Sequence, residues 1–512
     1  MFWVVLAANL IMMALFTWPA FYAAGIPVAL GAPAILLLAL ALLAFSGSTL
    51  VYAANHYALP ILTMLALWAA LCSVDNDNHM VRVTAESRSH GFMTREKTPD
   101  AQLLKAEQLN GLTLASYFQE WWTELQLSYP GDGSIPVFIV AAEGGGLRAA
   151  YWTAVVLAEL EDRTRGTGMP FSRHVFAISG VSGGSVGATL FDASLAARLR
   201  QTSSLSHREE LERVLGGDFL SDTFGYALFP DLLQRLLPIP VVSDRAIALE
   251  RSFERAWSAQ HRGQALQLTS AFHELWATEP HRVPLLFLNS TVVETGQRAI
   301  NYPLASAFPQ GDASFADTLP VGSVVGSAMP LSTAALLSAR FTYVSPAGLI
   351  DTRDTAGPRW KRLVDGGYFD NSGATTAQEL ARVLLESGGP RLRLIVLHLP
   401  NAPEPPSARL NAKHKTYSRL EFLSEVFAPV QTLLNTRGAR GTQAVSYLGR
   451  EQAIELLRIQ PQRNPVNAPL GWVLSGQVRH DLSAQLVGCG SSAAAGCAHE
   501  EIDKLVSLLH SR

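Results

Sequence analysis

The sequence has 512 residues, of which 48% are hydrophobic and only 16% are charged, and its formal net charge is −3. The charged fraction is low for a soluble protein, and no basic excess favours a nucleic-acid partner. Three cysteines are too few for a disulfide framework, and their spacing relative to the histidines matches no zinc site. We therefore expect no metal, no cofactor and no nucleic-acid partner.

The first 74 residues contain no Lys, Arg, Asp or Glu. Three apolar runs lie within them, at residues 2–22, 26–45 and 57–74, and each is close to the roughly 20 residues that cross a bilayer as a helix. A signal peptide would carry a basic start, which the first run lacks. Buried helices of soluble proteins rarely continue this far without a charge. We predict that residues 1–74 are a transmembrane segment of about three helices in an integral membrane protein.

Basic residues mark the side of the membrane that holds the rest of the chain. Those that follow the third run are Arg82, Arg88, Arg95 and Lys97, whereas the connecting stretches have none. Because Lys and Arg near segment ends favour the cytoplasmic side, we expect the large C-terminal part to be cytoplasmic. A reducing compartment disfavours disulfides, so we expect Cys489 and Cys497 to stay unpaired, although their Gly/Ser/Ala-rich stretch would allow pairing.

Residues 75–130 are predicted to be a linker that ends in an amphipathic helix, "SYFQEWWTELQLSYP" (116–130). Its Trp121 and Trp122 fit core packing better than a lipid surface.

After residue 130, short apolar strands alternate with glycine turns and helices. Strands are expected within 135–146, 173–180, 283–293 and 391–400, and helices over 147–163 and 186–199. This alternation predicts an α/β fold with a mostly parallel central sheet.

Ser182 stands in the sequence Gly180-Val181-Ser182-Gly183-Gly184, which fits G-x-S-x-G at a junction from strand to helix. Small neighbours permit the sharp, strained turn of a nucleophile elbow, and the turn exposes the serine hydroxyl. A single G-x-S-x-G also occurs by chance, so an ordinary glycine-rich turn is an equal alternative. Ser182 is our candidate nucleophile, with Gly180 and Gly184 as supporting residues.

Three glycines, Gly144, Gly145 and Gly146, follow the preceding strand. Their unobstructed N–H groups could hold the oxyanion of a tetrahedral intermediate. A phosphate-binding loop is the alternative, but the run is not G-x-G-x-x-G and no Gly-Lys-Ser/Thr follows. Arg148 is expected to hold this loop, in preference to binding a lipid phosphate.

A nucleophilic serine needs a base, and Asp365 with Gly366 and Gly367 follows an apolar strand end. Adjacent glycines would let the carboxylate approach another backbone, although Asp-Gly turns are common. Histidine is the alternative base. The candidates fit a core or surface role better, and they are His398, His480 and His499.

Together, Gly-Gly-Gly-x-Arg, G-x-S-x-G and Asp-Gly-Gly, in that order, resemble the patatin-like phospholipase family. Further segments look like those of its membrane-anchored bacterial members, at 244–257, 326–333 and 469–475. The resemblance covers about residues 135–480. It implies a three-layer α/β catalytic domain over 131–512, with a C-terminal extension.

The resemblance implies Ser182 as nucleophile and Asp365 as the only protein base, a dyad without histidine. It also makes the glycines at 144–146 the oxyanion loop. Many family members have Asp where this chain has Glu143 and Gly where it has Ala149, but neither change removes a backbone donor.

The implied function is a membrane-anchored serine hydrolase that cleaves fatty-acyl esters of phospholipids and other lipids through an acyl-enzyme. A non-catalytic lipid- or partner-binding membrane protein, an acyltransferase with the same dyad and a histidine-based triad hydrolase are the alternatives. Residues 227–242 would line an acyl pocket, form a lid or be an ordinary helical layer. The oligomeric state, the lipid head group and the acyl position stay open.

Overall fold

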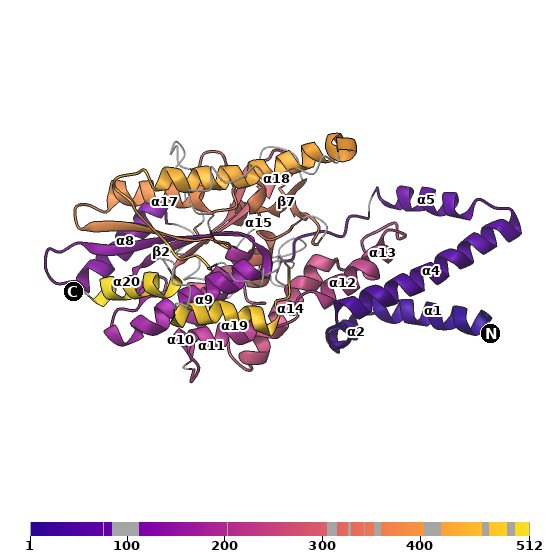
Figure 1. Ribbon diagram of the computed structural model, residues 1–512, viewed down its shortest axis with the longest axis horizontal. Coiled ribbons are helices and arrows are strands. Elements are labelled where there is room, and N and C mark those ends of the chain that lie inside the picture. Colours follow the sequence, from indigo (N-terminus) through magenta and orange to yellow (C-terminus); the bar gives the residue numbers. More distant parts are fainter. Residues whose placement is uncertain are drawn as a thin grey trace, which may run out of the picture.

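In the part of the chain that the structure describes, nine strands form a sheet at the centre of the main body (Figure 1). The computed structural model describes residues 2–74, 76–83, 112–201, 203–304, 315–325, 329–341, 344–352, 360–403, 421–462, 471–488 and 497–510. The strand order of the sheet is β5-β4-β3-β2-β1-β8-β9, and β7 pairs with both β3 and β6. The strands are β1 (Ile135–Ala142), β2 (Val175–Val181), β3 (Leu285–Val292), β4 (Arg298–Asn301), β5 (Thr318–Pro320), β6 (Gly348–Asp351), β7 (Trp360–Asp365), β8 (Leu392–Leu399) and β9 (Glu455–Arg458).

Most strand pairs in this sheet are parallel. The pairs β9-β8, β8-β1, β1-β2, β2-β3 and β4-β5 are parallel, whereas β3-β4, β3-β7 and β6-β7 are antiparallel. Every residue of β1, β2 and β3 is buried, as expected for strands covered by helices on both faces. The predicted α/β class with a mostly parallel central sheet is confirmed.

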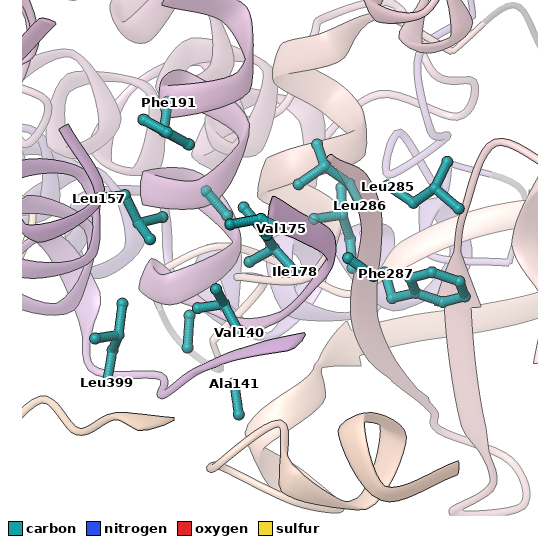
Figure 2. Close-up of a cluster of buried hydrophobic side chains, with 14 of the residues drawn as sticks. Val140, Ala141, Leu157, Val175, Ile178, Phe191, Leu285, Leu286, Phe287 and Leu399 are labelled. Atoms are coloured by element: carbon teal, nitrogen blue, oxygen red, sulfur yellow. The ribbon is translucent and has the colours of Figure 1, made fainter. Parts of the chain in front are cut away.

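Helices form a layer on each side of the sheet (Figure 1). One layer contains α9 (Gly146–Thr164), α10 (Gly183–Arg200), α11 (His207–Val214), α19 (Gly476–Val487) and α20 (Ala498–His510), and the other contains α8 (Leu114–Leu127), α17 (Ala374–Ser387) and α18 (Glu421–Leu448). In the core, Leu157 of α9 and Phe191 of α10 lie over Val140 and Ile178 of the strands (Figure 2). This packing holds the carboxyl ends of β1 and β2 beside the first turns of α9 and α10.

The remaining elements are shorter or lie at the edge of the body. They are α12 (Ser221–Leu228), α13 (Pro230–Gln234), α14 (Arg245–Gln260), α15 (Val321–Val325) and α16 (Leu331–Leu337), with 3-10 turns at Arg165–Thr167, Phe171–His174, Phe272–Leu275 and Gly366–Tyr368. Trp121 and Trp122 of α8 are buried in the main core, as predicted. Of the predicted linker, residue 75 and residues 84–111 lie outside the described residues.

The apolar N-terminal helices project from one end of the body (Figure 1). They are α1 (Phe2–Thr17), α2 (Pro19–Ala23), α3 (Ile26–Leu30), α4 (Ala32–Tyr57) and α5 (Ile61–Cys72). Among the described helices, only α4 is both long and apolar enough to cross a membrane, a property that signal sequences share. α1 and α5 are shorter apolar helices.

The predicted boundaries of the apolar runs need correction. Pro19 begins a new helix inside the first run, and Gly25 and Gly31, at φ 72° and 81°, turn the chain before α4. α4 therefore begins later and ends later than the second run, and α5 begins only after Pro60. Apolar composition identifies the N-terminal segment, but Pro and Gly residues determine where its helices begin and end.

Two of the three cysteines lie in the part of the chain that the structure describes. Cys72 is free and buried. Cys497 is disulfide-bonded, so the prediction that it stays unpaired is wrong. Cys489 lies outside the described residues. The prediction rested on the expected compartment, whereas the disulfide depends on how the chain brings two thiols together.

Candidate active site

Ser182 occupies a strained backbone turn between β2 and α10. β2 ends at Val181 and α10 begins at Gly183, and Ser182 between them has φ 52° and ψ −123°. Positive φ is rare and costly for a residue with a side chain, and such strain gathers at functional sites. Ser182 is 5% exposed, so its hydroxyl lies in a nearly closed site.

The glycines around Ser182 let the backbone of the elbow pack closely. A Cβ at Gly183 would overlap the carbonyl oxygen of Gly146, and one at Gly184 would lie 2.5 Å from the Ala142 oxygen. A Cβ at Gly180 would meet Ser185. These positions therefore hold the first turn of α10 directly against the glycine loop. These contacts are a steric basis for the supporting role predicted for Gly180 and Gly184.

Asp365 is the last residue of β7 and is 1% exposed. Burial raises the pKa of its carboxyl, while Arg437, the Ser182 hydroxyl and the Gly367 N–H lower it. Oδ1 accepts a hydrogen bond from the Gly367 N–H at 2.7 Å. In the part of the chain that the structure describes, no group has hydrogen-bonding geometry to Oδ2. The fold thus brings Ser182 close to a buried carboxylate with one oxygen open.

Gly366 and Gly367 allow the turn after Asp365 to lie deep in the site. A Cβ at Gly366 would overlap the Asn289 backbone oxygen, and one at Gly367 would lie 2.9 Å from Asp365 Oδ1. Side chains larger than hydrogen would not fit at either position without a shift of these atoms, which explains why two glycines follow Asp365.

Ser338, directly after α16, links the elbow to Asp365, and the sequence analysis missed it. Its Oγ accepts from the Ser182 N–H at 3.1 Å and donates to the Asn289 carbonyl. The Ser185 hydroxyl lies 2.7 Å away and must be the donor in that pair, because the only Ser338 proton is already used. The Ser338 carbonyl in turn accepts from the Gly366 N–H at 3.1 Å. A lone serine after an apolar helix carries no sequence signal.

Two of the three loop glycines have free amides. The Gly144 N–H donates to the Asn371 carbonyl at 2.9 Å, so it is not available to an oxyanion. Among the described residues, no acceptor takes the N–H groups of Gly145 and Gly146, which have φ 158° and 60°. We therefore narrow the expected oxyanion loop to Gly145 and Gly146.

Side chains from distant parts of the chain fix the glycine loop. Asn371 Nδ2 donates to the Gly144 carbonyl at 3.2 Å and to Glu143 Oε1 at 3.3 Å. Glu143 Oε2 accepts from the Asn401 N–H at 2.9 Å, and burial raises the pKa of Glu143. Arg148 Nη2 donates to Asn401 Oδ1 at 2.5 Å. These contacts support a loop-holding role for Arg148.

Arg437 of α18 is a second residue that the sequence analysis missed. Its Nη2 donates to Asn371 Oδ1 at 2.7 Å. Its guanidinium carbon lies 5.5 Å from the ring centre of Phe341 and 6.0 Å from that of Tyr368, within the range of cation–π contact. Its charge lowers the pKa of Asp365. One cation therefore acts on both the carboxylate and the support of the glycine loop.

The three histidines considered as bases have other surroundings. His398 is buried in β8, where desolvation lowers its pKa to about 3, and neither ring nitrogen has a hydrogen-bond partner among the described residues. His480 is exposed beside Asp481. His499 contacts the Leu486 carbonyl and Asp503. In the described ranges, no group of three or more His, Cys, Asp or Glu could hold a metal ion.

Comparison with known proteins gives only remote likenesses. No family model matches the chain, and no curated protein matches it. A solved structure of human GIVD cytosolic phospholipase A2 in complex with methyl gamma-linolenyl fluorophosphonate is 15% identical with a TM-score of 0.33, and the match covers 81% of this chain and 64% of that one. A second, of human GIVD cytosolic phospholipase A2, is 14% identical with a TM-score of 0.30 and covers 78% and 55%. The chain spans less than two thirds of either neighbour, and at these scores the likeness carries no argument about function.

Proposed function

We propose that this chain is a patatin-like serine hydrolase that cleaves fatty-acyl esters of membrane lipids. The observation that carries the proposal is Ser182 at a strained elbow, beside the buried and half-satisfied carboxylate of Asp365. The unpaired amides of Gly145 and Gly146 support it, since an acyl-transfer site needs donors for an oxyanion. A module that only binds lipid has no need of this combination.

The proposed reaction uses Asp365 as the only base. Ser182 Oγ attacks the ester carbonyl carbon and its proton passes to Asp365 Oδ2, while the Gly145 and Gly146 amides stabilise the oxyanion. The tetrahedral intermediate collapses, the acyl–oxygen bond of the substrate breaks, and Asp365 returns the proton to the leaving alcohol. Water then attacks the acyl-enzyme with Asp365 as base, which releases the fatty acid and regenerates Ser182.

Burial makes the aspartate a better base than it is in water. The reference pKa of Asp is about 3.9, and desolvation raises the pKa of Asp365 above its ordinary value. Arg437 acts in the opposite direction and favours the ionised carboxylate, the form that can accept a proton. This balance fits a base that works near neutral pH.

Membrane attachment is part of the proposal. Residues 1–74 form the anchor, 75–130 a linker with α8, and 131–512 the catalytic domain, which we place on the cytoplasmic side because of the basic residues after the anchor. The Cys497 disulfide opposes this side, because disulfides persist in oxidising compartments. The side of the membrane therefore needs a direct test.

An activity probe tests the catalytic proposal. A fluorophosphonate should label the wild-type chain in membranes and should not label Ser182→Ala, while Ser258→Ala, which changes an exposed serine of α14, should label normally. Equal labelling of Ser182→Ala would remove Ser182 as the nucleophile. Product analysis separates the acyltransferase alternative, because a hydrolase releases free fatty acid whereas a transferase places the acyl group on an added alcohol.

A further inference from the structure

Four large apolar side chains are exposed on α13 and the loop that follows it. They are Leu232, Leu233, Ile239 and Val241, which are 42%, 40%, 60% and 67% exposed. We call this surface the apolar shelf. Soluble proteins rarely gather such side chains on one exposed segment unless something covers them.

The shelf is continuous with the apolar N-terminal helices. Phe229, directly before α13, stacks on Phe16 of α1 with ring centres 4.6 Å apart. Trp68 of α5 donates its indole N–H to the Leu236 carbonyl at 3.0 Å. Figure 1 shows α12 and α13 between the body and the projecting helices. Whatever surrounds those helices must therefore also reach the shelf.

Buried side chains satisfy several backbone groups of the shelf. The fully buried Gln234 accepts from the N–H groups of Val241 and Val242, both at 3.0 Å, and donates to the Ile239 carbonyl at 2.8 Å. Asn76 donates to the carbonyls of Gln234 and Leu237, both at 3.1 Å. A loop in water would not need these partners. A loop against hydrocarbon does, because lipid offers no donors or acceptors.

The charged residues beside the shelf have polar partners. Asp231 forms an ion pair with Arg245 at 2.5 Å, and Arg235 donates a hydrogen bond to His79 at 3.1 Å. The ion pair lowers the electrostatic cost of bringing Asp231 and Arg245 toward a low-dielectric layer, whereas Arg235 keeps its positive charge.

We propose that the apolar shelf is buried in the bilayer surface next to the N-terminal helices, so that lipid acyl chains cover it. The inference rests on the proposed membrane anchoring, and it names the bilayer, not a second copy of the chain, as the partner. It would hold the domain that carries Ser182 and Asp365 at the membrane surface.

Depth-dependent quenching tests the shelf in the full chain reconstituted in phosphatidylcholine vesicles. Single cysteines replace exposed apolar residues in a Cys72→Ala background and carry an environment-sensitive fluorophore, and vesicle lipids carry a quencher on their acyl chains. The three positions are Ile239→Cys on the shelf, Leu37→Cys on α4 and Leu127→Cys at the end of α8. Leu37 and Leu127 are 68% and 82% exposed. Leu127 ends α8, which precedes the amino end of β1, whereas the site lies at the carboxyl ends of β1 and β2.

We expect quenching at Ile239→Cys and Leu37→Cys and none at Leu127→Cys. Quenching at Leu37→Cys without quenching at Ile239→Cys would overturn the shelf while leaving the anchor intact. Absence of quenching at Leu37→Cys would overturn the anchor and the shelf with it. Protection of Ile239→Cys that depends on protein concentration, without lipid quenching, would assign the surface to a second copy and overturn the proposal.

Activity gives a second readout. The double variant Ile239→Ser/Val241→Ser changes only exposed side chains, so hydrolysis of a water-soluble short-chain ester should stay at the wild-type rate. Hydrolysis of vesicle phospholipid should fall about threefold to tenfold, because apolar surface that faced lipid is lost. An equal fall with both substrates would indicate damage to the catalytic domain and would contradict the shelf.

Discussion

Asp365 is the residue on which the proposed chemistry depends most directly. In a triad the aspartate only orients a histidine, whereas in a dyad it is the base itself. Asp365→Asn keeps the shape of the side chain and removes the proton acceptor, so its loss of activity should be on the order of that of Ser182→Ala. The two losses should not add in the double variant, because the residues act as a unit. Turnover of a nitrophenyl ester and a phospholipid measures this, and near-normal turnover by folded Asp365→Asn would end the dyad assignment.

The same substitution should stabilise the protein. Because burial raises the pKa of Asp365, the folded state holds this proton more tightly than the unfolded state. The free energy of unfolding therefore falls as pH rises above the ordinary Asp pKa. Asp365→Asn has no charge to desolvate, so we expect it to melt higher than wild type at pH 7, with the difference shrinking near pH 4. A lower melting temperature at pH 7 would contradict this account.

Arg437 is expected to set the acid limb of the pH profile. Its charge lowers the pKa of Asp365, so Arg437→Gln should raise that pKa and move the acid limb of kcat/KM to higher pH. Arg437→Lys keeps the charge and should leave the limb near its wild-type position. Arg440→Gln is the matched control, since Arg440 stacks 3.9 Å from the Phe369 ring centre. An unmoved limb in Arg437→Gln would limit Arg437 to holding Asn371.

At the scale of elements, Ser338 joins α16 to the elbow, to β3 and to the Asp365 turn. Ser338→Ala leaves the buried Ser182 N–H without its acceptor, and an unsatisfied buried group costs about 1–3 kcal/mol. Ser185→Ala removes only a donor to Ser338, so its cost should be about 0.5–1.5 kcal/mol. We therefore expect Ser338→Ala to unfold at lower temperature than Ser185→Ala and to lose more turnover. Equal effects in thermal unfolding would show that Ser338 does not hold the elbow.

The elements that carry the site are predictable to different degrees. β1 and β2 follow from their buried apolar runs, and the elbow follows from glycines that only a close-packed turn requires. Ser338, Asn371 and Arg437 could not be assigned these roles, because each acts through contacts with residues far away in the chain and no local pattern marks those contacts. The helix limits before α4 do not follow from hydrophobicity, because Pro19 and two glycines set them inside a continuous apolar run.

At the scale of the whole molecule, the apolar helices determine on which side of a membrane the body would lie. The carboxyl ends of β1 and β2 carry the glycine loop and the elbow. α4 leads away from the body and the chain turns back into α5 (Figure 1), and the turn between them lies at the far end of the projecting helices. If α1, α4 and α5 all cross the bilayer, that turn and the catalytic body lie on opposite sides.

Two observations disagree about the side of the membrane on which the body lies. The basic stretch favours the cytoplasm, but Arg82 pairs with Glu250 and Glu254 inside the protein, and Arg88, Arg95 and Lys97 lie outside the described residues. The disulfide of Cys497 favours an oxidising side. We retain the cytoplasmic assignment, because charges near segment ends act during insertion, before the domain folds.

Cysteines placed at two exposed leucines test the membrane topology. Leu59, between α4 and α5, is 52% exposed, and Leu127 on the body is 82% exposed. In sealed right-side-out vesicles, an impermeant maleimide should label Leu59→Cys directly and Leu127→Cys only after detergent, and protease added outside should spare the catalytic domain. The reverse pattern would place the body on the outer side, in agreement with the disulfide and against the charge bias. Direct labelling of both positions would mean that the helices between them do not separate two compartments, and the three-crossing arrangement would then be wrong.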